Sequence, residues 1–152
     1  MTIDEIIAFL EGLDGVLALK PGPGDGTPEI AWGDAFFYYA PDGRVPTNVQ
    51  PFATIVTKDY PDDTGSRLDR PDAFRVNVHA GREAFVRATG YSPREIPEVD
   101  SSAIDTVLPH PLYKSAGWLA VVNPGPATRE TLLELISDSH ARARARYERD
   151  AG

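Results

Sequence analysis

The chain has 152 residues, a net charge of −8, 41% hydrophobic residues and no cysteine. This length suits one domain, so we expect a single domain over residues 1–152. The lack of cysteine excludes disulfides, thiolate nucleophiles and cysteine-ligated metal centres. Acidic residues stand where a signal peptide is basic, and no apolar run approaches the ~18 residues of a membrane span. We therefore predict a cytoplasmic protein with no membrane partner.

The charge is unevenly distributed along the chain. Residues 1–66 contain 11 acidic and 3 basic residues, whereas residues 67–152 contain 12 of each. One basic run, with Arg142, Arg144, Arg146 and Arg149, falls at the end of the last predicted helix, where cations complement the helix dipole. An acidic front half disfavours a phosphate backbone as partner, so we predict no nucleic-acid partner.

The first half of the chain predicts one helix followed by strands. Thr2 and Glu5 form a capping-box pattern, and apolar residues follow at helical spacing until the glycines at 12 and 15. A short strand is expected over 16–20, and the segment 21–28 is too rich in glycine and proline for regular structure. Further strands are predicted over 29–32, 35–40 and 52–58. Bulky residues on both faces of 35–40 indicate an interior strand.

The second half begins with a long polar loop over 59–72, a kind of segment that is often functional in compact domains. A strand over 74–79, a helix over 81–89, an irregular crossing over 91–105 and strands over 106–108 and 118–123 follow. A final helix over 128–149 has an inward stripe made of Leu132, Ile136, Ser139, Ala143 and Tyr147. This order predicts an α+β fold, with an antiparallel sheet covered by helices on one face.

The clearest candidate site lies on the strand over 74–79. Because Phe74, Val76 and Val78 share one face, Arg75, Asn77 and His79 share the other. A guanidinium, an amide and an imidazole in a row can bind a carboxylate or a phosphate, with His79 as a proton carrier. The alternative is a solvated sheet face whose residues have cross-strand partners.

Two further groups are candidates for ligand contact. Lys58 opens the long loop and Arg67, Asp69 and Arg70 close it, so these charges either grip an anion or stabilise the loop by local ion pairs. His110 lies between two prolines, with Tyr113 three residues further on, which suits either a ligand-facing residue or a loop histidine whose hydrogen bonds are made within the protein.

His140 is expected at the boundary of the core. The histidines show no ligand spacing, so we predict neither a metal nor a cofactor.

Several long motifs resemble known families. The blocks PFATIVTKDYP, SRLDRPDAFRVN, AGREAF and HPLYKSAGWLAVVNPGP resemble an uncharacterised family of short actinobacterial proteins, a domain of unknown function. The segments FRVNVHAGREAFVRATG, WLAVV and ETLLELISDSHARARA are similar in order to YjbR/MmcQ-like proteins. That second resemblance covers the C-terminal half and implies a CyaY-like fold, with helices on one face of an antiparallel sheet.

Three hypotheses for function follow, in this order. The first is a domain that binds a small anionic molecule, or an accessory domain, and that uses the free sheet face and the 59–72 loop. The second is a small acid–base enzyme that uses His79 or His110, with Arg75 holding the substrate. The third is a DNA-binding protein, which the YjbR-like resemblance suggests and the net charge of −8 disfavours. Convergence of Arg75, His79 and His110 in one pocket would favour the enzyme.

The charge distribution predicts no useful affinity for DNA. In a gel-shift assay with duplex DNA at about 150 mM salt, we expect no complex with a dissociation constant below about 1 μM, the upper limit of ordinary non-specific attraction. Tighter binding would show that the arginine run of the last helix forms a nucleic-acid surface.

Overall fold

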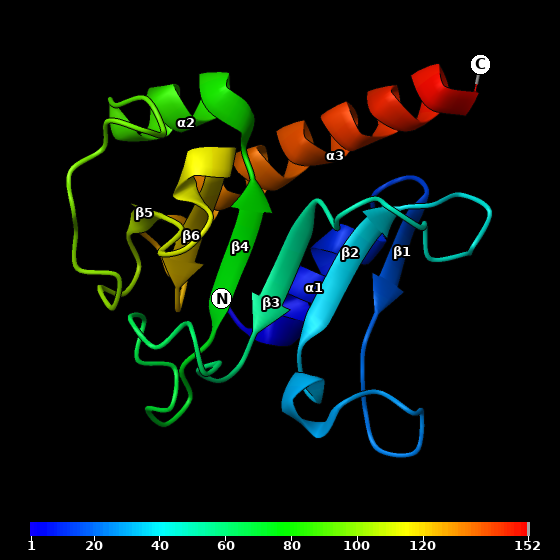
Figure 1. The fold of residues 1–152 in the computed structure, drawn as a ribbon, viewed down its shortest axis with the longest axis horizontal. Helices are drawn as coiled ribbons and strands as arrows, with labels where there is room; N and C mark the ends of the chain where they lie inside the picture. Colours follow the sequence, from blue (N-terminus) through cyan, green and yellow to red (C-terminus); the bar gives the residue numbers. More distant parts are fainter. Residues whose placement is uncertain (152) are drawn as a thin grey trace.

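The computed structural model describes residues 1–151 and contains a six-stranded sheet in the order β1-β2-β3-β4-β6-β5 (Figure 1). Every neighbouring pair of strands is antiparallel. The strands are β1 (Val16–Leu19), β2 (Ala35–Tyr39), β3 (Ala53–Val56), β4 (Arg75–His79), β5 (Val107–Pro109) and β6 (Trp118–Val122). The helices are α1 (Ile3–Glu11), α2 (Gly81–Thr89) and α3 (Arg129–Ala151), with short 3-10 turns η1 (Glu29–Ala31) and η2 (Lys114–Ala116).

The helices pack on one face of the sheet, as Figure 1 shows for α1 and α3 behind the strands. Ile6 of α1, Phe85 of α2 and Ile136 of α3 are each completely buried there. They contact the strand residues that point backwards, among them Phe37 and Val76. The predicted α+β fold with helices on one face is therefore confirmed. None of the helices within residues 1–151 combines the length and apolar character needed to cross a membrane.

Local signals in the sequence account for most of these elements. Thr2 and Glu5 form the reciprocal capping box at the start of α1. Gly90 adopts a φ of 81° and ends α2, as its freedom from a Cβ allows. Residues 74, 76 and 78 enter the helix-covered core, so Arg75 and Asn77 point to the opposite face of the sheet, as predicted from strand parity.

Two structural predictions were wrong. Residues 29–32 were expected to form a strand, but they form the turn η1, in which the Trp32 N–H donates to the Glu29 carbonyl over 3.0 Å. Pro28 before this turn and Gly33 after it, with a φ of 88°, leave too few residues to pair with a neighbouring strand. Tyr147 was expected in the core and is 36% exposed, because the last turns of α3 extend past the strand ends (Figure 1).

The inward stripe of α3 should carry much of the stability of the fold. Leu132→Ala or Ile136→Ala should each lower the free energy of unfolding by about 2–5 kcal/mol, because each leaves a cavity in a closed core. Tyr147→Ala is the matched control and should cost well under half as much. Urea denaturation followed by circular dichroism measures all three, and equal effects would contradict the observed packing of the helix.

Candidate functional site

The face of the sheet opposite the helices, which we call the open face, carries a cavity of about 610 Å³. Strand residues form its floor: Phe36, Tyr38, Thr54, Val56, Arg75, Asn77 and Trp118. Three segments form its walls: η1 with Pro28, Ile30 and Ala31; the loop with Tyr60, Asp62 and Asp63; and the turn with His110, Leu112 and Tyr113. Gln50 and Pro51 complete the lining. This volume is in the range of small-molecule sites.

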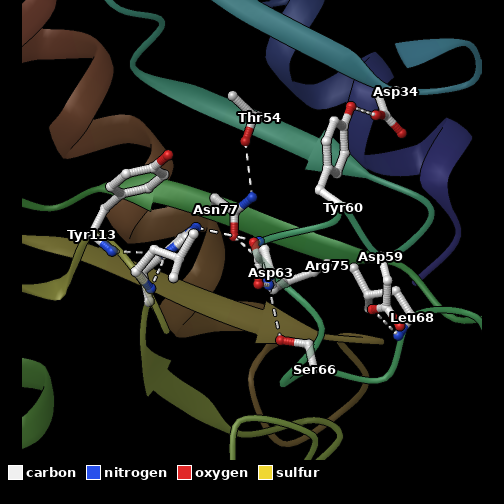
Figure 2. Close-up of polar contacts among 12 residues, drawn as sticks. Asp34, Thr54, Asp59, Tyr60, Asp63, Ser66, Leu68, Arg75, Asn77 and Tyr113 are labelled. Carbon is white, nitrogen blue, oxygen red and sulfur yellow. Dashed lines mark hydrogen bonds and ion pairs between the residues drawn. The ribbon is translucent and has the colours of Figure 1, made fainter. Parts of the chain in front are cut away.

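A buried ion pair stands at the centre of the open face. Arg75 is only 2% exposed, and its two terminal nitrogens donate to both carboxylate oxygens of Asp63, over 3.1 and 2.6 Å. The guanidinium also donates to the Ser66 hydroxyl over 2.9 Å and, through Nε, to the Asn77 side-chain oxygen over 2.7 Å (Figure 2). Asn77 in turn donates to the Thr54 hydroxyl over 2.9 Å. This bidentate arrangement is the strong form of an arginine–carboxylate contact.

The 59–72 loop reaches Arg75 because its own residues hold it against the sheet. Leu68 is 2% exposed and packs on Val56 and Val122 at the open face. The Asp59 carboxylate accepts the Leu68 N–H over 2.8 Å, and Arg70 donates to the Ser66 carbonyl over 3.0 Å. The loop is therefore anchored by an apolar plug and by local hydrogen bonds, which bring Asp63 over β4.

The charge of Arg75 is balanced inside the protein. Burial raises the pKa of the Asp63 carboxyl, but the hydrogen bonds and positive charge of Arg75 outweigh burial and leave that pKa below its ordinary value. Asp63 is therefore ionised at neutral pH and neutralises Arg75. The sequence predicts Arg75 as a ligand for an anion, but four of its five N–H groups already have partners on the loop and the sheet.

His110 is the second buried polar residue of the cavity wall and is 3% exposed. Its Nδ1 accepts the backbone N–H groups of Leu112 and Tyr113, over 3.0 and 3.1 Å. Its Nε2 lies 3.3 Å from the Nη2 atom of Arg75. Burial and the positive charge of Arg75 lower the pKa of His110 to about 3, so the ring is neutral at physiological pH.

Lys58 belongs to a neighbouring network rather than to the cavity. Its ammonium donates to the buried Asp34 carboxylate over 2.9 Å and to the Trp32 carbonyl over 2.8 Å. Tyr60, which does line the cavity, donates its hydroxyl hydrogen to the same carboxylate (Figure 2). Burial, followed by the hydrogen bond to Asp34, raises the pKa of Tyr60 above its ordinary value. Asp34 thus fixes the position of one aromatic wall of the cavity.

His79 lies apart from the other candidates. Its Nε2 is 3.1 Å from the Ala116 carbonyl, and its ring is 5.4 Å from the Trp118 ring, measured between centroids. The Trp118 ring is also 6.5 Å from that of His110. Burial and the positive charges of Arg142 and Arg146 lower the pKa of His79.

Of the six residues predicted from the sequence to contact a ligand, the cavity lining includes Arg75, Asn77, His110 and Tyr113 but neither Lys58 nor His79.

Sequence reasoning missed the aromatic character of this site. Phe36, Tyr38, Tyr60 and Trp118 line the cavity together with Tyr113, which was already a candidate. The alternation in the segment 35–40 contained part of this signal, because residues 36 and 38 share the face that the helices leave uncovered. Within residues 1–151, no group of three or more histidine, aspartate or glutamate side chains is placed to hold a metal ion.

Comparison with known proteins gives a family for the chain. Residues 1–152 match the model of a family described as a family of unknown function, DUF6194. The chain belongs to the DUF6194 family. No curated protein and no solved structure gives a significant match. The domain of unknown function expected from the long motifs is thus confirmed, whereas the actinobacterial and YjbR-like resemblances find no support in these comparisons.

The Arg75–Asp63 pair predicts strong coupling between the loop and the sheet of this DUF6194 protein. Asp63→Asn or Arg75→Met alone should each lower the free energy of unfolding by about 3–5 kcal/mol, since each leaves one buried polar group without its partner. The double variant should lose much less than the sum. Chemical denaturation of the four proteins measures this cycle, and additive losses would show that the pair contributes nothing as a unit.

The same pair should produce a defined pH dependence. Because the pKa of Asp63 is depressed in the folded protein, its contribution to stability is complete above the ordinary value of 3.8 and is lost as the pH falls through the folded value. Asp63→Asn should flatten the stability profile in that acidic window and leave its slope near neutral pH unchanged. A variant profile parallel to that of the parent protein below about pH 4 would contradict the assignment.

Proposed function

We propose that this protein binds a small, neutral, ring-bearing molecule in the cavity on the open face. The observation that carries the proposal is the composition of the lining: aromatic side chains from the floor and the walls surround a polar centre whose hydrogen bonds are largely made within the protein. Ligand sites in proteins are typically apolar cavities of this size with a few fixed polar groups. Flat aromatic side chains favour a flat partner, which can stack against them or meet their edges.

The charges of the lining favour a neutral ligand over the small anion expected from the sequence. Arg75 contributes one positive charge, whereas Asp62 and Asp63 contribute two negative charges. The guanidinium is neutralised by Asp63 at contact distance, so a bound anion would meet the unpaired charge of Asp62 at the wall. An anion would also have to compete with Asp63 for the guanidinium.

The acid–base enzyme is the weaker alternative. A general base needs a free ring nitrogen within reach of the substrate. The Nδ1 atom of His110 already accepts two backbone N–H groups, and His79 lies in a smaller pocket beside Ser139 and Arg146. Arg75, His79 and His110 therefore do not converge on one point, which was the feature that would have favoured catalysis.

One-ring compounds should bind in this cavity with dissociation constants of about 1 mM, as expected for ligands of so few atoms. Titration with acetophenone, followed by ¹H–¹⁵N correlation spectra, should shift the amide signals of Thr54, Asn77 and Trp118. Signals from the helix-covered core, such as that of Ile136, should stay in place. The absence of any shift at saturating concentrations of the compound would refute the proposal.

A pair of tryptophan substitutions separates specific from non-specific binding. Ala31 lies in the cavity wall, so Ala31→Trp should fill part of the space and abolish these shifts. Ala141 is exposed on α3, so Ala141→Trp adds the same side chain away from the cavity and should leave binding unchanged. Equal binding by both variants would place the compound elsewhere on the surface.

A further inference from the structure

His110 has a fixed tautomer, which follows from hydrogen-bond geometry alone. Two backbone N–H groups, of Leu112 and Tyr113, point at Nδ1 over 3.0 and 3.1 Å. An imidazole nitrogen that accepts hydrogen bonds with its lone pair cannot also carry a proton, so the neutral ring must carry its proton on Nε2. The low pKa of His110, about 3, agrees with a ring that remains neutral. The Nε2 atom is therefore a hydrogen-bond donor and not an acceptor.

This donor faces another donor. Within residues 1–151, the polar atom at hydrogen-bond distance from Nε2 is Nη2 of Arg75, 3.3 Å away, and a guanidinium nitrogen can only donate. Nη2 makes its own short contact, 2.6 Å long, to the Asp63 carboxylate. The Nε2–H of His110 is thus a buried donor without an acceptor in the described part of the chain. Such a group destabilises a protein by about 1–3 kcal/mol unless something satisfies it.

We propose that the Nε2–H of His110 donates to an uncharged carbonyl oxygen of the molecule bound in the cavity. This inference rests on the proposed function and specifies the chemistry of the ligand. His110 lies in the cavity wall, so an acceptor placed there would satisfy the imidazole N–H. A buried N–H that otherwise lacks a partner favours ligands with a carbonyl group, because ligands without an acceptor leave that N–H unsatisfied.

The surroundings of the imidazole favour a carbonyl attached to a ring. The Tyr113 ring lies 4.8 Å from the imidazole and the Trp118 ring 6.5 Å from it, measured between centroids. These two rings therefore flank the donor with apolar surface. An ammonium group offers no acceptor to Nε2–H. A carboxylate would be repelled by Asp62, because Arg75 is already neutralised by Asp63. An aryl ketone, aldehyde, ester or amide meets both requirements.

Four matched one-ring probes test the proposal by isothermal titration calorimetry and NMR: acetophenone, ethylbenzene, benzoate and benzylamine. Both acetophenone and ethylbenzene carry a two-carbon chain on one ring, and acetophenone adds the carbonyl oxygen that can accept a hydrogen bond. Acetophenone should bind about 3- to 10-fold more tightly than ethylbenzene, the ratio that one net hydrogen bond provides. Benzoate and benzylamine should both bind more weakly than acetophenone.

The four affinities distinguish the role of His110 from ligand binding in the cavity as such. Equal affinities for acetophenone and ethylbenzene would overturn the role of His110 and leave a purely apolar binding site. If benzoate bound most tightly, the ligand would be an anion and not an uncharged carbonyl compound. Failure of all four to bind would remove the proposed function itself.

A variant and a spectrum test His110 directly. In His110→Asn, the side-chain oxygen can still accept the backbone N–H groups, as in an Asx turn, but no donor reaches the position of Nε2. The preference for acetophenone over ethylbenzene should disappear in this variant. In the parent protein, long-range ¹H–¹⁵N spectra should show His110 as the Nε2–H tautomer between about pH 5 and 8, with its Nε2 signal shifted by acetophenone. A proton on Nδ1, or titration of His110 within this range, would overturn the proposal.

Discussion

The ion pair between Arg75 and Asp63 joins the loop after β3 to the centre of the sheet, and the shape of the cavity depends on this connection. Burying two charges is costly, and the cost is offset here by bidentate contact and by the additional partners Ser66 and Asn77. An apolar pair of similar volume would serve stability equally well. A buried ion pair instead fixes the loop in one register, with Asp63 above β4 and Tyr60 at the cavity wall.

The two faces of the sheet therefore differ in composition and in packing. The helix-covered face is a closed apolar core around residues such as Phe37, Val76 and Ile136. The open face carries a polar centre and a cavity lined by aromatic side chains. Because neighbouring residues of each strand point to opposite faces, one short strand, β4, contributes Val76 to the core and Arg75 and Asn77 to the site. Substitutions in the helix-covered core, such as Ile136→Ala, should therefore lower stability without changing the lining of the cavity, whereas substitutions of Arg75 or Asp63 should change both.

Local rules made much of the fold predictable from the sequence. The capping box at Thr2, the glycine at 90 and the parity of β4 each depend on a few adjacent residues. The partner of Arg75 was not predictable, because Asp63 reaches it through a loop in which Arg67 and Asp72 adopt positive φ values of 56° and 59°. The cavity was not predictable for the same reason, because its aromatic residues come from distant segments of the chain. The alternation within residues 35–40 indicated only part of it. The role of His110 depends on the backbone turn that occupies its Nδ1.

The central claim is that the cavity is a binding site in which His110 provides the specific donor. A crystal structure of the protein soaked with acetophenone tests this claim most directly. We expect the ring between η1 and the Tyr113 turn, the carbonyl oxygen about 3 Å from the Nε2 atom of His110, and the Arg75–Asp63 pair intact. An empty cavity at saturating concentration, or a compound whose oxygen points away from His110 into solvent, would contradict it.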